Sequence, residues 1–212
     1  MAFVTDLIWT LDLLGFYGFY VITAVMGTHV VTISRKTVAC GIRGVWTFLG
    51  FCVGIPLSDA VNHGLKPWIR DPRPEGGRPM VLRPGWPMAG PDGTDASLYT
   101  GVQVYGYPSG HAQRVFYALA FFYCLLRSVP SPDAWQRRWR VWGGWFLFCG
   151  LVACMTLYQR WKYRRHTVEQ LFGGAVLGTV MGGLTFAVTQ ALWEWGVRSP
   201  APLRTLTSGV CE

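Results

Sequence analysis

Uncharged apolar stretches separated by short polar or basic segments set the pattern of this chain. Residues 13–34 carry no charged side chain. At about 1.5 Å per residue, a helix of this length can cross a hydrocarbon core about 30 Å thick. Four later stretches have similar apolar character: residues 44–65, 107–127, 141–158 and 170–193. The pattern predicts an all-α, polytopic membrane helix bundle of about five transmembrane helices.

Three other features complete the predicted organisation of a single membrane-embedded domain over residues 1–212. Residues 1–12 are apolar with two acidic side chains, which is typical of an N-terminal interfacial helix. Residues 71–107 are rich in proline and glycine without any regular period, so we predict a long irregular loop that covers a functional site. In the last apolar stretch Gly174, Gly178 and Gly182 share one helical face, which predicts close helix packing.

Composition favours a membrane protein and narrows the chemistry. Hydrophobic residues make up 51% of the chain and charged residues only 14%, which does not suit a water-soluble domain. The net charge of +8 does not indicate nucleic-acid binding, because the basic residues gather at the ends of apolar stretches. Four of the six cysteines lie within apolar stretches without CxxC spacing, so we interpret them as small buried residues. No basic segment opens the chain, and a cleaved signal peptide is not expected.

Three polar clusters lie at the edges of the apolar stretches, and the central one is Tyr107-Pro108-Ser109-Gly110-His111. At a helix start, Pro108 suits the first turn and Ser109 can donate to an oxyanion. Gly110 lets the backbone approach a ligand, and His111 can carry a proton. The alternative for Ser109 alone is a purely structural N-cap. The other clusters span residues 66–74 and 160–166 and contribute Lys66, Arg70, Arg73, Arg160, Lys162, Arg164, Arg165 and His166.

Alternating chain direction should bring these clusters to one membrane face. Lys66 follows the second predicted span, His111 opens the third, Arg160 follows the fourth and His166 opens the fifth. The short connections on the other side are basic, which favours a cytosolic location for them and a lumenal or exterior location for the clusters.

The second predicted span also carries Asp59, Asn62 and His63, and polar groups at this depth need partners. We expect hydrogen bonds to neighbouring helices. The alternatives are a direct catalytic role and an indirect role in positioning Lys66.

This combination of residues favours phosphoryl-group chemistry. Fixed cations and backbone amides can stabilise a phosphoryl group while one histidine attacks phosphorus and the other protonates the leaving oxygen. The sequence offers no acidic cluster for a metal, so neither a metal ion nor another cofactor is expected. The alternative is that the basic residues are interfacial anchors or bind anionic headgroups passively.

The spacing of the clusters resembles the three signature motifs of the type-2 phosphatidic acid phosphatase and vanadium haloperoxidase superfamily. Six residues separate Lys66 from Arg73, the Pro-Ser-Gly-His motif follows at residues 108–111, and five residues separate Arg160 from His166. The resemblance covers roughly residues 44–190. Membrane spans favour a phosphatase over a haloperoxidase.

This resemblance implies a role for each residue of the clusters. His166 would be the nucleophile that forms a phosphohistidine, and His111 the acid that protonates the leaving group. The phosphate would be held by Lys66, Arg73, Ser109, Gly110 and Arg160.

Two positions depart from the superfamily pattern. Gln159 replaces the serine that usually precedes the motif arginine, and Gln170 replaces the aspartate that usually follows the nucleophilic histidine. A neutral amide at residue 170 should orient the imidazole but stabilise its cation less than a carboxylate does. Glu169 is the alternative orienting group. Thr167 and Gln170 also fit a helix capping box, and both uses of Gln170 require that its amide oxygen be shared.

The residues around Gln170, together with residues 58–62 and 107–113, resemble the dolichyl-diphosphatase family. That resemblance implies hydrolysis of the polyisoprenoid lipid dolichyl diphosphate to dolichyl phosphate and phosphate, at the lumenal face of the endoplasmic reticulum. Arg164 or Arg165 would contact the second phosphate, unless both are interfacial anchors. The alternatives are a phosphatase for phosphatidic acid, phosphatidylglycerol phosphate or undecaprenyl diphosphate, and a catalytically inactive phosphate-binding membrane protein.

Overall fold

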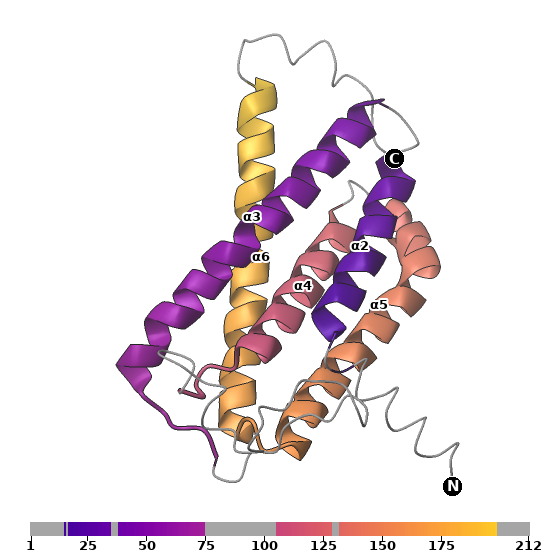
Figure 1. The fold of residues 1–212 in the computed structure, drawn as a ribbon. Coiled ribbons are helices and arrows are strands. Elements are labelled where there is room, and N and C mark those ends of the chain that lie inside the picture. The colour runs from indigo at the N-terminus through magenta and orange to yellow at the C-terminus, as the bar shows by residue number, and fades with distance from the viewer. Residues whose placement is uncertain (1–14, 16, 35–37, 75–104, 129–131, 199–212) are drawn as a thin grey trace, which may run out of the picture.

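The computed structural model describes residues 15, 17–34, 38–74, 105–128 and 132–198. Five helices occupy these residues: α2 Gly18–Ser34, α3 Val38–Ile69, α4 Gly110–Arg127, α5 Pro132–Lys162 and α6 Val168–Arg198. They pack as a bundle, which confirms the predicted all-α class (Figure 1). The expected helix over residues 1–12 and the interior of the predicted loop, residues 75–104, lie outside the described residues.

Three of these helices have the length and apolar character to cross a membrane. They are α3, α5 and α6, with qualifying segments Ile42–Ile69, Gln136–Lys162 and Val168–Gly196, while Gly18–Thr32 of α2 is apolar but shorter. The third predicted apolar stretch, now α4, is less apolar because it lies in the centre of the bundle and contacts all four other helices. Its Gln113 side chain, for example, is fully buried and contacts protein rather than lipid.

Helix α4 packs most closely against α6 because of the predicted glycine stripe. A Cβ atom added to Gly174, Gly178 or Gly182 would lie 2.4, 2.1 or 2.4 Å from a backbone oxygen of Ser109, Gln113 or Tyr117. No side chain fits such a gap, so the prediction of close packing is confirmed.

The deep polar residues of α3 bind the start of α4. The Asn62 amide donates to Pro108 O at 3.1 Å and to the Gln113 side chain. Asp59 accepts three hydrogen bonds from Arg114, the shortest at 2.7 Å. These partners confirm the structural interpretation of Asp59 and Asn62, because buried polar groups are stable in apolar surroundings only when they are paired. His63 lies exposed on α3. The polar contacts fix the end of α3 beside the N-terminus of α4.

Two expectations from the sequence need correction. Helix α3 continues to Ile69 despite Pro56 and Pro67, so Lys66 lies within its last turn rather than after it. Cys149 is buried, but Cys52 and Cys154 are exposed on the outer face of the bundle. The outer face of a membrane protein is apolar as well, so an apolar stretch alone does not separate buried residues from lipid-facing ones.

Candidate active site

The predicted clusters meet at one end of the bundle. The C-terminal ends of α3 and α5 and the N-terminal ends of α4 and α6 lie together at the lower end of Figure 1. His111 interacts electrostatically with Arg160 and with His166, and His166 interacts with Lys66, Arg73 and Arg160. The predicted convergence at one face is therefore confirmed.

Ser109 caps helix α4 and is held against α6. Its hydroxyl oxygen accepts from Ala112 N at 3.5 Å, and its backbone N–H donates to Gln170 O at 3.0 Å. The structural interpretation of Ser109 is thus confirmed, but the hydroxyl proton can still be donated to an oxyanion. Pro108 precedes the cap instead of occupying the first turn. Above Gly110 the nearest atom to an added Cβ is Asn62 Oδ1 at 3.8 Å, so neighbouring side chains leave this helix start open.

His166 lies in the connection between α5 and α6, with only 4% of its surface exposed. Its Nδ1 lies 3.2 Å from Gln170 Oε1, and its Nε2 lies 3.2 Å from Arg73 Nη1. A guanidinium can only donate, so Nε2 must carry the lone pair and Nδ1 the proton. Burial lowers the pKa of His166 from 6.5 to about 3, and the Arg73 charge acts in the same direction. The ring is therefore neutral, and its Nε2 lone pair faces the basic cluster.

Gln170 both completes the helix capping box with Thr167 and contacts the His166 imidazole. Its Oε1 accepts from Thr167 N at 3.2 Å and also contacts His166 Nδ1, so the amide oxygen is shared between the capping box and the histidine. Thr167 Oγ1 in turn accepts from Gln170 N at 3.3 Å. Glu169 is exposed. Gln170, and not Glu169, therefore contacts the imidazole.

The Gln170 amide nitrogen reaches the segment after α3. It donates to Asp71 Oδ2 at 2.8 Å and to Pro72 O at 2.7 Å. Gln170 is fully buried, and these bonds use both of its N–H groups. Because Oε1 receives a backbone N–H and Nε2 faces a carbonyl, the orientation of the amide is unambiguous.

Three cations surround the neutral histidine. Lys66 and Arg160 are only 5% and 6% exposed, and Arg73 also donates to Arg165 O at 3.0 Å. Burying like charges together is costly, and a bound anion would relieve the repulsion. The cluster is therefore suited to a phosphate group.

Arg164 and Arg165 end helix α5 in a Schellman motif. Arg165 N donates to Arg160 O and Arg164 N to Trp161 O, both at 2.9 Å. Arg164 occupies the left-handed position that usually holds glycine, with a φ of 48°, and its side chain is exposed. The turn directs the chain from Arg160 to His166. A contact of either arginine with a second phosphate stays a prediction.

The described ends of the long loop meet beside this site. Pro72 and Tyr105 form an isolated antiparallel bridge, and Gly106 N donates to Asp71 O at 2.8 Å. Gly106 packs directly on Gln170, since an added Cβ would lie 2.3 Å from its Oε1. The loop base is therefore part of the site. The interior of the loop and its predicted covering role lie outside the described residues.

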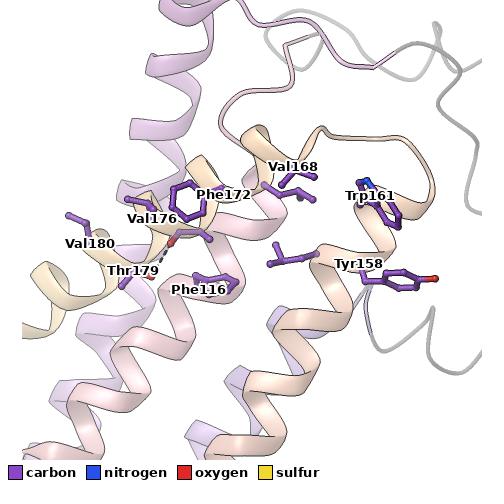
Figure 2. Close-up of a pocket in the computed structure, with 11 residues that line it drawn as sticks. Phe116, Tyr158, Trp161, Val168, Phe172, Val176, Thr179 and Val180 are labelled. Carbon is purple, nitrogen blue, oxygen red and sulfur yellow. Dashed lines mark hydrogen bonds between the residues drawn. The ribbon is translucent and has the colours of Figure 1, made fainter.

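An apolar groove of about 600 Å³ runs along the outside of the bundle next to this site. Figure 2 shows its side chains, which come from α4, α5 and α6. Trp161 follows Arg160 in the chain and Leu171 follows Gln170, so one end of the groove adjoins the basic cluster. The lining residues are Phe116, Leu157, Tyr158, Trp161, Val168, Leu171, Phe172, Ala175, Val176, Thr179 and Val180.

Sequence reasoning missed Asp71 and the groove. Asp71 contacts a residue 99 positions away, and no local pattern marks that pairing. The aromatic and aliphatic side chains of the groove look like ordinary lipid-facing residues in the sequence. Their distinguishing feature is the space between α5 and α6, which depends on how the helices pack.

Known proteins share the sequence pattern of this chain. The sequence profile of the PAP2 superfamily matches residues 46–194. Dolichyldiphosphatase 1 of Mus musculus is 28% identical over 150 residues, covering 68% of this chain and 53% of the relative. Lipid phosphate phosphatase gamma of Arabidopsis thaliana is 26% identical over 152 residues, covering 70% and 53%. The chain spans about half the length of these curated relatives.

A solved structure, the transmembrane PAP2-type phosphatidylglycerolphosphate phosphatase of Bacillus subtilis, aligns over 89% of this chain and 87% of its own. The TM-score is 0.48 and the identity 18%. The profile match covers well over half of the sequence and contains all three motif clusters. The chain therefore belongs to the PAP2 superfamily.

Proposed function

We propose that the protein is a lipid phosphatase that transfers a phosphoryl group from its substrate to His166 Nε2 and then to water. The observation that carries this proposal is the state of His166. The ring is neutral, its proton is held on Nδ1 by Gln170, and its Nε2 lone pair lies against Arg73 within a buried cationic cluster. An incoming phosphate would displace this Arg73 contact and present phosphorus to the nucleophile.

In the first step the Nε2 lone pair forms a bond to phosphorus. The phosphorus–oxygen bond to the leaving group breaks, and its electron pair stays on the leaving oxygen, which takes a proton from His111. Anion binding favours the protonated form of His111, because the phosphate charge offsets the surrounding cations. Lys66, Arg73 and Arg160, with Ser109 and the amides at the start of α4, would hold the phosphoryl oxygens.

In the second step water attacks the phosphohistidine. His111 accepts a proton from the water, the nitrogen–phosphorus bond breaks, and its electron pair returns to Nε2. Phosphate leaves and the starting protonation states are restored. No step of this scheme needs a metal ion or another cofactor, because the basic residues and helix amides supply the charge stabilisation.

The groove supports a substrate with a long apolar tail. It follows α6 from Val168 to Val180, which at about 1.5 Å per residue corresponds to roughly 18 Å. Phe172 and Val168 are 70% and 62% exposed, so the groove opens sideways toward the membrane. A lipid can keep its tail there while its phosphate enters the cluster at headgroup depth.

For the substrate we propose a polyisoprenoid diphosphate such as dolichyl diphosphate, which would yield the lipid monophosphate and phosphate. Support comes from the dolichyldiphosphatase relative, from Gln170 in the position of the usual aspartate, and from the additional positive charges of Arg164 and Arg165 beside the site. The basic connections at the opposite membrane face favour a site open to the lumen of the endoplasmic reticulum.

A second candidate substrate is a lipid with a single terminal phosphate, such as phosphatidic acid or phosphatidylglycerol phosphate. The lipid phosphate phosphatase relative from Arabidopsis thaliana favours it. The groove suits either kind of tail. A third candidate is a membrane protein that binds phosphate without hydrolysing it. The replacement of the usual aspartate by Gln170 favours it.

Phosphate release by the purified protein in the presence of a chelator tests these alternatives. Dolichyl diphosphate, dolichyl phosphate and phosphatidic acid should be compared, and we expect the diphosphate to react fastest. His166→Ala and His111→Ala should each remove most activity, whereas His63→Ala, an exposed histidine on α3, should retain it. Absence of phosphate release from all three lipids, or loss of activity on adding the chelator, would contradict the proposal.

A further inference from the structure

The Asp71 carboxylate is linked to the His166 imidazole through the side chain of Gln170. His166 Nδ1 lies 3.2 Å from Gln170 Oε1, and Gln170 Nε2 lies 2.8 Å from Asp71 Oδ2. We propose that Asp71 is a positioning residue for phosphoryl transfer, which acts on His166 through the Gln170 amide. This inference rests on the proposed function. It assigns to Asp71 the negative charge that an aspartate usually supplies at the position of Gln170.

The structure fixes Asp71 at both its main chain and its side chain. Its carbonyl accepts from Gly106 N at 2.8 Å, and the next residue, Pro72, bridges to Tyr105. The Pro72 carbonyl takes the second N–H of Gln170 at 2.7 Å. Gln170 therefore cannot turn away from Asp71 without losing two hydrogen bonds.

The charge of Asp71 matters most after attack has begun. When the Nε2 lone pair becomes a bond to phosphorus and the bond to the leaving oxygen breaks, Nδ1 keeps its proton and the ring becomes a cation. The Asp71 carboxylate polarises the Gln170 amide, which makes Oε1 a stronger acceptor for Nδ1–H and stabilises that cation. Asp71 has no contact with the phosphate in this scheme. Its effect should therefore appear in kcat rather than in substrate binding.

Asp71→Asn separates charge from hydrogen bonding, because the asparagine Oδ1 can still accept from Gln170. We expect kcat to fall on the order of ten-fold, as for other second contacts to a functional histidine. KM should stay constant or decrease, because a negative charge leaves the neighbourhood of an anion site. The thermal midpoint should be unchanged. Asp133→Asn, an exposed residue at the opposite end of the bundle, is the matched control and should behave as wild type.

A paired substitution tests the contact between the two side chains independently. Gln170→Glu places two carboxylates together and removes the donors to Asp71 and Pro72, so activity should fall strongly. Adding Asp71→Asn restores a donor and leaves one carboxylate in direct contact with His166. The double variant should be at least ten-fold more active than Gln170→Glu alone. A double variant no more active than that single variant would overturn the proposal.

Labelling of His166 with phosphate from labelled substrate separates this inference from the function beneath it. In samples with equal amounts of folded protein, wild type should be labelled rapidly and Asp71→Asn about ten-fold more slowly. Equal labelling rates in the two proteins, or a loss that matches a lower folded yield, would overturn the role of Asp71 alone. Failure of wild type to label would overturn the proposed function and this inference together.

Discussion

Gly106→Ala should disable the site by displacing one side chain. An added Cβ would lie 2.3 Å from Gln170 Oε1 and 2.4 Å from both Cδ and Nε2, whereas ordinary contact begins at 3.4 Å. The amide must then move by roughly 1 Å, since the Gly106 backbone is held by its bond to Asp71 O. A shift of that size disrupts the contacts of the amide with His166, Thr167, Asp71 and Pro72.

The expected cost follows from those four contacts. Each is worth about 1 kcal/mol net, and buried groups left unpaired cost more, so we expect about 2–4 kcal/mol of lost folding free energy after partial relaxation. Loss of the Nδ1–H partner should also lower kcat by about 10- to 100-fold, because His166 is no longer held in the reactive tautomer.

Thermal unfolding in detergent and phosphate release together measure both effects. Gly64→Ala is the matched control, because beyond its own helical turn no atom lies within 4 Å of an added Cβ there, and it should be neutral or slightly stabilising. In a Gln170→Ala background the added methyl group has nothing to displace, so Gly106→Ala should then cost little. Wild-type kcat in Gly106→Ala, or an equal cost in both backgrounds, would refute the reasoning.

Two further predictions concern the turn before α6. Arg164→Gly should raise the free energy of unfolding by about 1 kcal/mol, because a residue other than glycine is strained in the left-handed conformation. If Arg164 contacts a second phosphate, the same variant should lose more diphosphate hydrolysis than monophosphate hydrolysis. Equal losses of the two activities would exclude that contact. Folding lowers the pKa of His166 from 6.5 to about 3. At a pH between these two values the unfolded chain therefore binds one proton more than the folded chain. Stability should therefore decrease as pH falls through that window, and His166→Gln should lose less, as monitored by thermal midpoints; identical pH profiles would contradict the buried, neutral state.

Periodicity and motif spacing were enough to predict the bundle and the meeting of the polar clusters at one of its ends. Apolar runs predict where helices lie, and the alternation of their directions brings His111 and His166 to the same end. The need for a shared Gln170 oxygen also followed from the sequence, because the capping box and the histidine contact use the same atom. Local signals of this kind carry much of the architecture of a helical membrane protein.

The parts that could not be predicted depend on tertiary contacts. Asp71 reaches Gln170 across 99 residues, and the groove depends on the separation of α5 and α6. The sequence predicts a span that ends before Lys66, but α3 continues through Pro67 to Ile69, so Lys66 lies inside the helix. Helix α4 is less apolar than expected because other helices, not lipid, surround it.

The central claim is that His166 Nε2 accepts the phosphoryl group. Its most direct test is rapid alkaline quenching of the purified protein during turnover of labelled dolichyl diphosphate, followed by mass-spectrometric location of the label. We predict a phosphohistidine at His166 that forms before steady state and is absent from His166→Ala. Continued phosphate release without any labelled histidine, or a label at His111 instead, would contradict this account.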